Sequence, residues 1–129
     1  MTLDSSALIA ILFSETGFLA LVDCILEADV VRVGAPTLVE TGIVLAGRKR
    51  GKPGRELEDL VRELAITVVP FGEAEWHAAG AAFDRYGRGR HKAALNFGDC
   101  LAYAAAAVAG DSLLFVGADF RHTDIPAAF

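Results

Sequence analysis

The chain has 129 residues, the length of one ordinary domain with one sizeable core, so we expect a single domain over residues 1–129. Hydrophobic residues make up 53% of the chain and charged residues 22%, a composition that excludes an intrinsically disordered protein. The net charge of −5 argues against non-specific adhesion to nucleic acid, although an acidic protein can still carry a local basic patch.

The first half of the chain predicts short strands that are each followed by helices. Residues 1–4 are a strand candidate, and the two serines that follow can cap a helix running to residue 13. Apolar residues at helical spacing predict a second helix over 18–27, and 30–33 is the next strand candidate. A proline suits the first turn of a third helix over 36–47, and we expect Glu40 in that first turn.

The second half continues the alternation. An apolar stripe over 57–64 predicts a fourth helix, and the β-branched residues of 66–69 predict a strand that stops at a proline. Helices follow at 76–86 and 99–109, and 113–116 is the last strand candidate. Short apolar strands that alternate with helices predict an α/β fold, with a parallel sheet of about four to five strands and helices on both faces.

No segment has the pattern of a membrane anchor or a secretory signal. The longest run without a charged residue, Cys100 to Gly110, is well short of the ~20 residues of a spanning helix. The first residues carry no Lys or Arg before the apolar stretch, unlike a secretory signal. We therefore expect a cytoplasmic protein that does not enter the membrane.

Four acidic residues lie where a predicted strand ends or a predicted helix begins, namely Asp4, Glu40, Asp99 and Asp119. In open parallel sheets the ligand site lies outside the carboxyl ends of the strands, so these positions are expected to converge. An acid at a helix N-terminus also complements the helix dipole, by ~0.3–1 kcal/mol, so any one of them alone can be a simple cap. The occurrence of all four favours a shared site.

Carboxylates that converge repel one another, and a divalent cation relieves that repulsion. Oxygen ligands favour Mg²⁺ or Mn²⁺, whereas zinc prefers His and Cys, and the three histidines of this chain show no metal-ligand spacing. Carboxylates holding one or two such ions are suited to activating water and stabilising an in-line displacement at phosphorus. Phosphodiester hydrolysis is therefore the leading chemistry.

The stretches that carry these acids are LDSSALIAIL, APTLVETGIVL, RYGRGRHKAALNFGDCLAYA and LLFVGADFRHTDI. Together they resemble the PIN-domain family, in particular the VapC-type toxins of toxin–antitoxin pairs, and the resemblance spans nearly the whole chain. It implies a ribonuclease with Mg²⁺ or Mn²⁺ as cofactor. It also implies that Asp4, Glu40 and Asp99 match the catalytic and metal-binding acids of the family, and that Ser6 matches a supporting hydroxyl residue.

The resemblance further implies an endoribonuclease that cuts transfer or ribosomal RNA, forms a homodimer and is silenced by a cognate VapB-type antitoxin. The fourth acidic position departs from the family pattern, because many relatives place that acid where this chain has Gly117. Asp119 is the nearest carboxylate able to complete the site, and Asp124 is the alternative. Asp119 could instead cap a short turn without any metal.

Basic residues gather just before Asp99, and we expect this cluster to hold RNA phosphates beside the acids. Its members are Arg88, Arg90, His91 and Lys92. A solvated loop would explain the same charges equally well. A second basic cluster, Arg48 to Lys52 with Arg55, is more simply explained as a solvated turn between helices.

The main alternative is a non-catalytic α/β interaction module whose acids are helix caps. A phosphatase of the haloacid-dehalogenase type needs a second acid where this chain has Ser6, so that class is disfavoured. Titration with Mg²⁺ or Mn²⁺ separates the two remaining hypotheses, because a cluster that binds the ion is stabilised by it and a set of caps is not.

Overall fold

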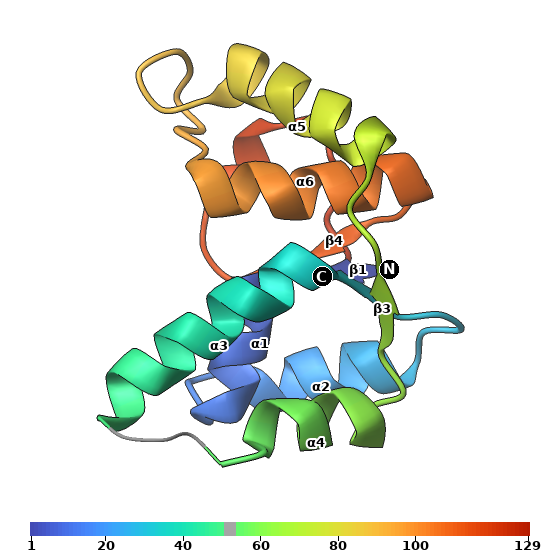
Figure 1. Cartoon of the computed structure of the whole chain (residues 1–129). Helices are drawn as coiled ribbons and strands as arrows, with labels where there is room; N and C mark the ends of the chain where they lie inside the picture. Colours follow the sequence, from blue (N-terminus) through green and yellow to red (C-terminus); the bar gives the residue numbers. More distant parts are fainter. Residues whose placement is uncertain (51–53) are drawn as a thin grey trace.

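The computed structural model describes residues 1–50 and 54–129, and its strands form one four-stranded parallel sheet (Figure 1). The order across the sheet is β3-β2-β1-β4. The strands are β1 (Thr2–Leu3), β2 (Arg32–Gly34), β3 (Thr67–Val69) and β4 (Leu113–Leu114). Within the described residues the helices are α1 (Ser5–Leu12), α2 (Phe18–Leu26), α3 (Ala35–Lys49), α4 (Glu56–Glu63), α5 (Glu73–Tyr86), α6 (Phe97–Ala109) and the 3₁₀ helix η1 (Asp119–His122).

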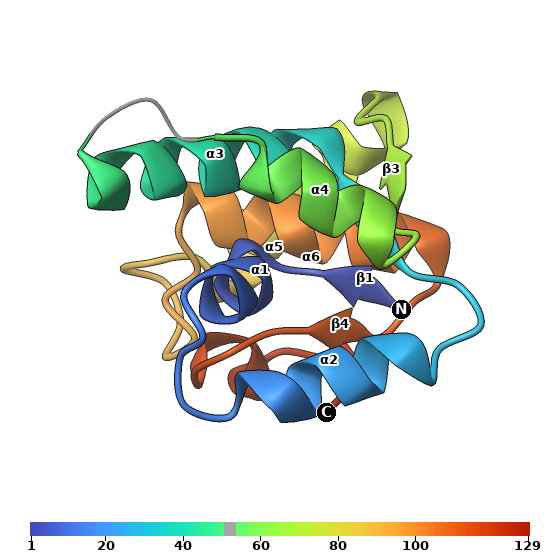
Figure 2. The ribbon, with the colours of Figure 1, turned by 90° about the horizontal axis from the view of Figure 1, so that it is seen from below.

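Helices cover both faces of the sheet, as the sequence predicts for an α/β fold (Figures 1 and 2). Helices α5 and α6 pack on one face, and α1, α2 and α4 pack on the other, with α3 alongside α1. The two faces are visible within β4, because side chains alternate along a strand. Leu113 joins the core with α5 and α6, and Leu114 joins the core with α1 and α2. The expected fold class is confirmed.

Helix α6 lies close against the sheet because small side chains line its buried face. Ala102, Ala104 and Ala106 are completely buried, and a Cβ added at Gly34 of β2 would lie 3.4 Å from the Cβ of Ala105. This close packing brings the first turn of α6 to the carboxyl ends of the strands. Asn96 caps the helix, so α6 begins two residues earlier than the predicted start at Asp99.

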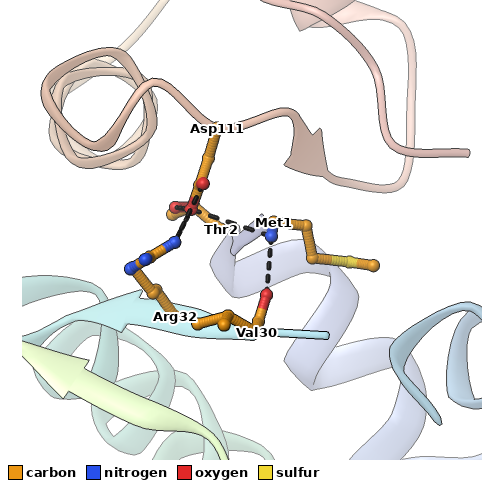
Figure 3. A network of polar contacts seen from close by, with 5 residues as sticks. All are labelled: Met1, Thr2, Val30, Arg32 and Asp111. Atoms are coloured by element: carbon orange, nitrogen blue, oxygen red, sulfur yellow. Dashed lines mark hydrogen bonds and ion pairs between the residues drawn. The ribbon is translucent and has the colours of Figure 1, made fainter. Parts of the chain in front are cut away.

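At the opposite edge of the sheet, Asp111 connects the amino ends of the strands (Figure 3). Its carboxylate accepts hydrogen bonds of 2.9 Å from Nη1 of Arg32 and of 2.8 Å from the hydroxyl of Thr2. The amino group of Met1 lies 3.7 Å from the same carboxylate and donates to the carbonyl of Val30 at 2.7 Å. This network joins β1, β2 and the turn after α6, so it stabilises the central strands.

Two further expectations concern α3 and the chain that follows it. Helix α3 begins at Ala35, directly after β2, so Glu40 lies in its second turn and not in the first. In the second basic cluster, Arg48 and Lys49 lie in the last turn of α3 and not in a turn between helices, because α3 extends past the predicted end at residue 47. They pair with Glu15 and Glu56, while residues 51–53 lie outside the described residues. Among the helices of residues 1–50 and 54–129, none is both long and apolar enough to cross a bilayer.

Candidate active site

The carboxyl ends of β1 and β4 lie side by side at the point where the chain changes direction in the sheet. From β1 the chain continues outward through β2 to β3, then returns to place β4 on the other side of β1. Ligands of open α/β sheets bind outside the carboxyl ends of the strands at such a switch point. Asp4 directly follows β1, and Asp119 lies in the segment that follows β4.

Asp4 is held in place by the first turn of α1. It is the N-cap of that helix, and its Oδ2 accepts hydrogen bonds from the backbone N–H of Ser6, at 3.0 Å, and from the Ser6 hydroxyl. Only 4% of Asp4 is exposed, and this burial raises its pKa, although the bonds from Ser6 act in the opposite direction. Both of these hydrogen bonds from Ser6 go to the same oxygen, Oδ2.

Ser6 also connects Asp4 to the end of β4. Its hydroxyl oxygen accepts a hydrogen bond of 3.0 Å from the backbone N–H of Val116, the second residue after the strand. The hydroxyl therefore donates to one side of the switch point and accepts from the other. Ser6, expected as a supporting residue, lies where it orients Asp4 and holds the loop that leads to Asp119.

Glu40 reaches this edge from α3 and is half-buried. Its Oε1 accepts a hydrogen bond from the hydroxyl of Ser5, the residue that follows Asp4. Its Oε2 lies over the first turn of α6, where a Cβ added at Gly98 would lie 1.8 Å from this oxygen. The Glu40 carboxylate is therefore placed between the residue after Asp4 and the residue before Asp99.

Asp99 is the acid whose pKa is affected by the charges of the other three acids. It is in the first turn of α6, where its Oδ2 accepts from the backbone N–H of Asn96 while the Asn96 side chain accepts from the Asp99 N–H, both at 2.9 Å. Burial raises the pKa of Asp99 to about 6, and the negative charges of Asp4, Asp119 and Glu40 also raise it. These four carboxylates are thus close enough to interact electrostatically.

The structure separates the two candidates for the fourth acid. Asp119 is exposed in η1, and its charge contributes to the raised pKa of Asp99. Asp124 accepts a hydrogen bond of 2.6 Å from Tyr103 and forms an ion pair of 3.2 Å with Arg85, and these contacts lower its pKa. Of the two, Asp119 is the acid whose charge acts on Asp99, while Asp124 is engaged by Tyr103 and Arg85.

The four carboxylates do not form a closed coordination shell in the chain alone. Across residues 1–50 and 54–129, no three His, Cys, Asp or Glu side chains are arranged to contact one ion together. Like charges repel, and Asp4 and Asp99 each turn one oxygen toward a nearby donor. The donor set is nevertheless entirely oxygen and strongly anionic, which fits Mg²⁺ or Mn²⁺ far better than zinc.

The basic cluster lies in the loop between α5 and α6, which ends at the cap of α6 (Figure 1). Arg90 lies 3.9 Å from Asp84, and the half-buried His91 accepts a backbone hydrogen bond at Nδ1. Arg88 and Lys92 are exposed and have no ion-pair partner within the described part of the chain. These two residues are the cations best placed to meet an external phosphate.

An apolar groove of about 930 Å³ runs from Glu40 along α3. Val39 and Ile43 on α3 and Phe97 on α6 line it and are 63%, 68% and 80% exposed. A smaller cavity of about 320 Å³, which includes Trp76 of α5, shares Phe97 with the groove. This is an extensive apolar surface directly beside the acids.

The family model described as PIN domain matches residues 1–126. The chain belongs to the PIN domain family. The match confirms the resemblance stated from the sequence, and it includes all four acids. A chain of a solved structure, a toxin–antitoxin complex from Klebsiella pneumoniae, has the same fold, with a TM-score of 0.70 at 15% identity. The match covers 99% of this chain and 97% of that one.

Several curated relatives match nearly end to end. VapC ribonuclease Mb0625 of Mycobacterium bovis and ribonuclease VapC28 of Mycobacterium tuberculosis are each 42% identical over 129 residues, with 99% of this chain and 97% of theirs covered. Ribonuclease VapC of Mycolicibacterium smegmatis is 39% identical, with 98% of both chains covered. This PIN domain is therefore similar to VapC proteins over its full length.

Three residues that position the acids were not predicted from the sequence, namely Asn96, Ser5 and Gly98. The spacing of Asn96 and Asp99 is a capping-box pattern and could have been found. Ser5 and Gly98 carry no such signal, because their contact with Glu40 joins parts of the chain that are far apart in sequence.

Proposed function

We propose that this PIN domain is a metal-dependent endoribonuclease, the VapC-type toxin of a type II toxin–antitoxin pair, which hydrolyses phosphodiester bonds of transfer or ribosomal RNA. The observation that carries the proposal is the gathering of Asp4, Glu40, Asp99 and Asp119 at the switch point of the sheet. Burial raises the pKa of Asp99 there, and the charges of the other three acids raise it further. A carboxyl group whose pKa is raised by burial and by neighbouring acids at such a position is typical of a catalytic site. The relatives named as VapC ribonucleases support the same activity.

In this proposal each acid has its own role. Asp4 and Asp99 hold a divalent cation directly, and Glu40 holds it or orients the attacking water. Mg²⁺ or Mn²⁺, when bound, would supply the charge that activates water and stabilises in-line displacement at phosphorus. Asp119 is exposed and acts at the outer side of the site. Ser6 keeps Asp4 oriented through its hydrogen bond to Oδ2.

The basic cluster binds the substrate in this proposal. Arg88 and Lys92 carry free positive charges, and the loop that contains them leads to the helix carrying Asp99. Phosphate oxygens of RNA would contact these cations, assisted by Arg90 and His91. The cations would also offset the repulsion between an acidic site and an anionic substrate.

The test compares RNA cleavage by the parent, Asp99→Asn and Asp23→Asn with Mn²⁺ or with excess EDTA. Asp23 is an exposed acid on α2, away from the strand ends, so its variant is the matched control. We expect cleavage by the parent and the control with Mn²⁺, and none by Asp99→Asn or in EDTA. Undiminished cleavage in excess EDTA would overturn the proposal.

A second candidate is favoured by one observation, namely that Asp4 is the N-cap of α1 and the Asp99 side chain completes the capping box of α6. In that case the chain would be a non-catalytic interaction module. A module of this kind is not stabilised by millimolar Mn²⁺ and cleaves no RNA, whereas an ion-binding site raises the unfolding temperature.

The partners follow from the same proposal. We propose that the protein acts in the cytoplasm as a homodimer and is neutralised by a cognate VapB-type antitoxin. The exposed apolar surface formed by Val39, Ile43 and Phe97 is large for an isolated chain, and burying it would favour association. Light scattering at tens of micromolar should give the mass of a dimer, and mixing with the antitoxin should increase it. A monomer that gains no mass on mixing would contradict this part of the proposal.

A further inference from the structure

Glu40 differs from the other acids in how it is held. It projects from α3, while Asp4 is the N-cap of α1 and Asp99 lies in the first turn of α6. Within the described residues it forms no ion pair with Lys, Arg or His, and its side-chain donor is the hydroxyl of Ser5. A neutral donor orients a carboxylate without cancelling its charge, which leaves Glu40 able to attract a cation.

The position of Oε2, the other carboxylate oxygen of Glu40, is possible only because Gly98 has no side chain. A Cβ added at Gly98 would lie 1.8 Å from Oε2, 2.7 Å from Cδ and 3.0 Å from Oε1 of Glu40. Cβ atoms do not approach other heavy atoms so closely, so any residue larger than glycine would displace this carboxylate. The space above Gly98 is therefore occupied by Glu40.

Backbone conformation gives no reason for glycine at this position. Gly98 is the second residue of α6 and is not among the glycines with a left-handed φ. Alanine is the better helix former at such a site, so glycine here is a local cost to the helix. The contact with Glu40 supplies the reason for it.

We propose that Ser5 and Gly98 are positioning residues for Glu40, which together set its carboxylate between Asp4 and Asp99 for cation binding. Ser5 holds Oε1 from α1, and Gly98 leaves room for Oε2 on α6. Because Ser5 follows Asp4 and Gly98 precedes Asp99, the two contacts align Glu40 with both of these acids. This inference rests on the proposed function, since it concerns the same ion.

The first experiment measures Mn²⁺ binding to the metal-free protein by calorimetry, without RNA, for the parent, Ser5→Ala, Gly98→Ala and Gly80→Ala. Gly80 is a helical glycine of α5 with no atom within 4 Å of an added Cβ, so its variant is the matched control. We expect Ser5→Ala and Gly98→Ala each to weaken Mn²⁺ binding about tenfold, as is usual for residues that orient a ligand. Ser5→Thr keeps the hydroxyl and should restore binding, and Gly80→Ala should bind as the parent does.

Stability separates positioning from a structural role. Gly98→Ala should unfold at the same temperature as the parent or higher, because alanine favours the helix. In a Glu40→Gln background, Gly98→Ala should cause no further loss of Mn²⁺ binding, because both changes act on one carboxylate. A loss of binding that is fully additive to that of Glu40→Gln would overturn the inference.

A second measurement does not depend on the metal. The carboxyl ¹³C resonance of Glu40 in the metal-free protein should move in Ser5→Ala and Gly98→Ala and stay unchanged in Gly80→Ala. If the parent binds Mn²⁺ and Gly98→Ala binds it equally well, the positioning role is wrong and the proposed function stands. If the parent binds no Mn²⁺, the proposed function is wrong, and the resonance alone decides whether Ser5 and Gly98 place Glu40. If the Glu40 resonance does not move in Ser5→Ala and Gly98→Ala, the inference is overturned in either case.

Discussion

The hydroxyl of Tyr103 donates a hydrogen bond of 2.6 Å to the carboxylate of Asp124. Tyr103 lies on α6, one turn beyond Asp99, and Arg85 of α5 forms an ion pair of 3.2 Å with the same carboxylate. The contacts with Tyr103 and Arg85 lower the pKa of Asp124. Asp119 remains as the carboxylate of this segment that acts on Asp99.

We predict that Asp119→Asn and Asp124→Asn have different effects. Asp119→Asn should lower the cleavage rate several-fold and raise the Mn²⁺ concentration required, because it removes charge from the site. Asp124→Asn should retain cleavage per folded molecule and lose about 1 kcal/mol of stability, because its bonds to Tyr103 and Arg85 are weakened. Cleavage assays across a Mn²⁺ titration and thermal denaturation measure both effects. Full activity of Asp119→Asn with a raised metal requirement in Asp124→Asn would move the fourth position to Asp124.

Asp99 should make the stability of the metal-free protein depend on pH. Its folded pKa, about 6, is above the ordinary value of 3.8, so the ionised form is disfavoured in the folded state. The resulting destabilisation is absent below the ordinary pKa, develops between the two values and is complete above the folded one. Because Asp99 is partly solvent-exposed, screening reduces the effect to about 1 kcal/mol.

Asp99→Asn removes this charge and can keep the hydrogen bond from Asn96 through its amide oxygen. In EDTA at pH 7.5 it should therefore unfold about 3 °C above the parent, and at pH 4 the difference should vanish. Thermal denaturation at the two pH values measures this, with Asp23→Asn as the control. If Asp99→Asn unfolds several degrees below the parent at pH 7.5, the acid is structural and its catalytic assignment is wrong.

Asp111 should matter for stability and not for cleavage. Asp111→Ala leaves Arg32 and the buried Thr2 hydroxyl without their partner, which should cost about 2 kcal/mol. The matched control is Glu15→Ala, which breaks the exposed pair with Arg48 and should cost under about 1 kcal/mol. Chemical denaturation gives both values. A loss of cleavage per folded molecule in Asp111→Ala would show that the two edges of the sheet are coupled.

The exposed cations of the loop before α6 should govern RNA binding. The double variant Arg88→Ala with Lys92→Ala should raise KM for RNA. The slope of log binding constant against log salt concentration should fall by about one unit for each phosphate that the protein no longer neutralises. Affinity for Mn²⁺ should not change, because neither side chain belongs to the acidic site. The control is Arg62→Ala on α4, whose exposed side chain pairs with Asp59. An unchanged KM in the double variant would show that the cluster is a solvated loop with no role in RNA binding.

Much of the fold could be predicted from the sequence. The alternation of strands and helices was readable because apolar periodicity, caps and breakers act over a few residues. The lengths of the strands could not be predicted in this way. The strand expected over 113–116 pairs with β1 through Leu113 and Leu114 alone. Its partner β1 is limited to Thr2–Leu3, and a strand lasts only as long as its neighbour does. The length of β4 therefore depends on pairing between the two ends of the chain.

The sequence by itself determined the α/β class, the family and the position of four acids at the ends of elements. Only the tertiary structure decided which contacts hold the acidic side chains. Ser5 donates to Glu40, the Glu40 carboxylate lies over Gly98, and Tyr103 donates to Asp124. Such contacts join side chains 21 to 58 residues apart in the chain. They arise from how closely α1, α3 and α6 pack around the sheet, and residue patterns over a few positions carry no information on that packing.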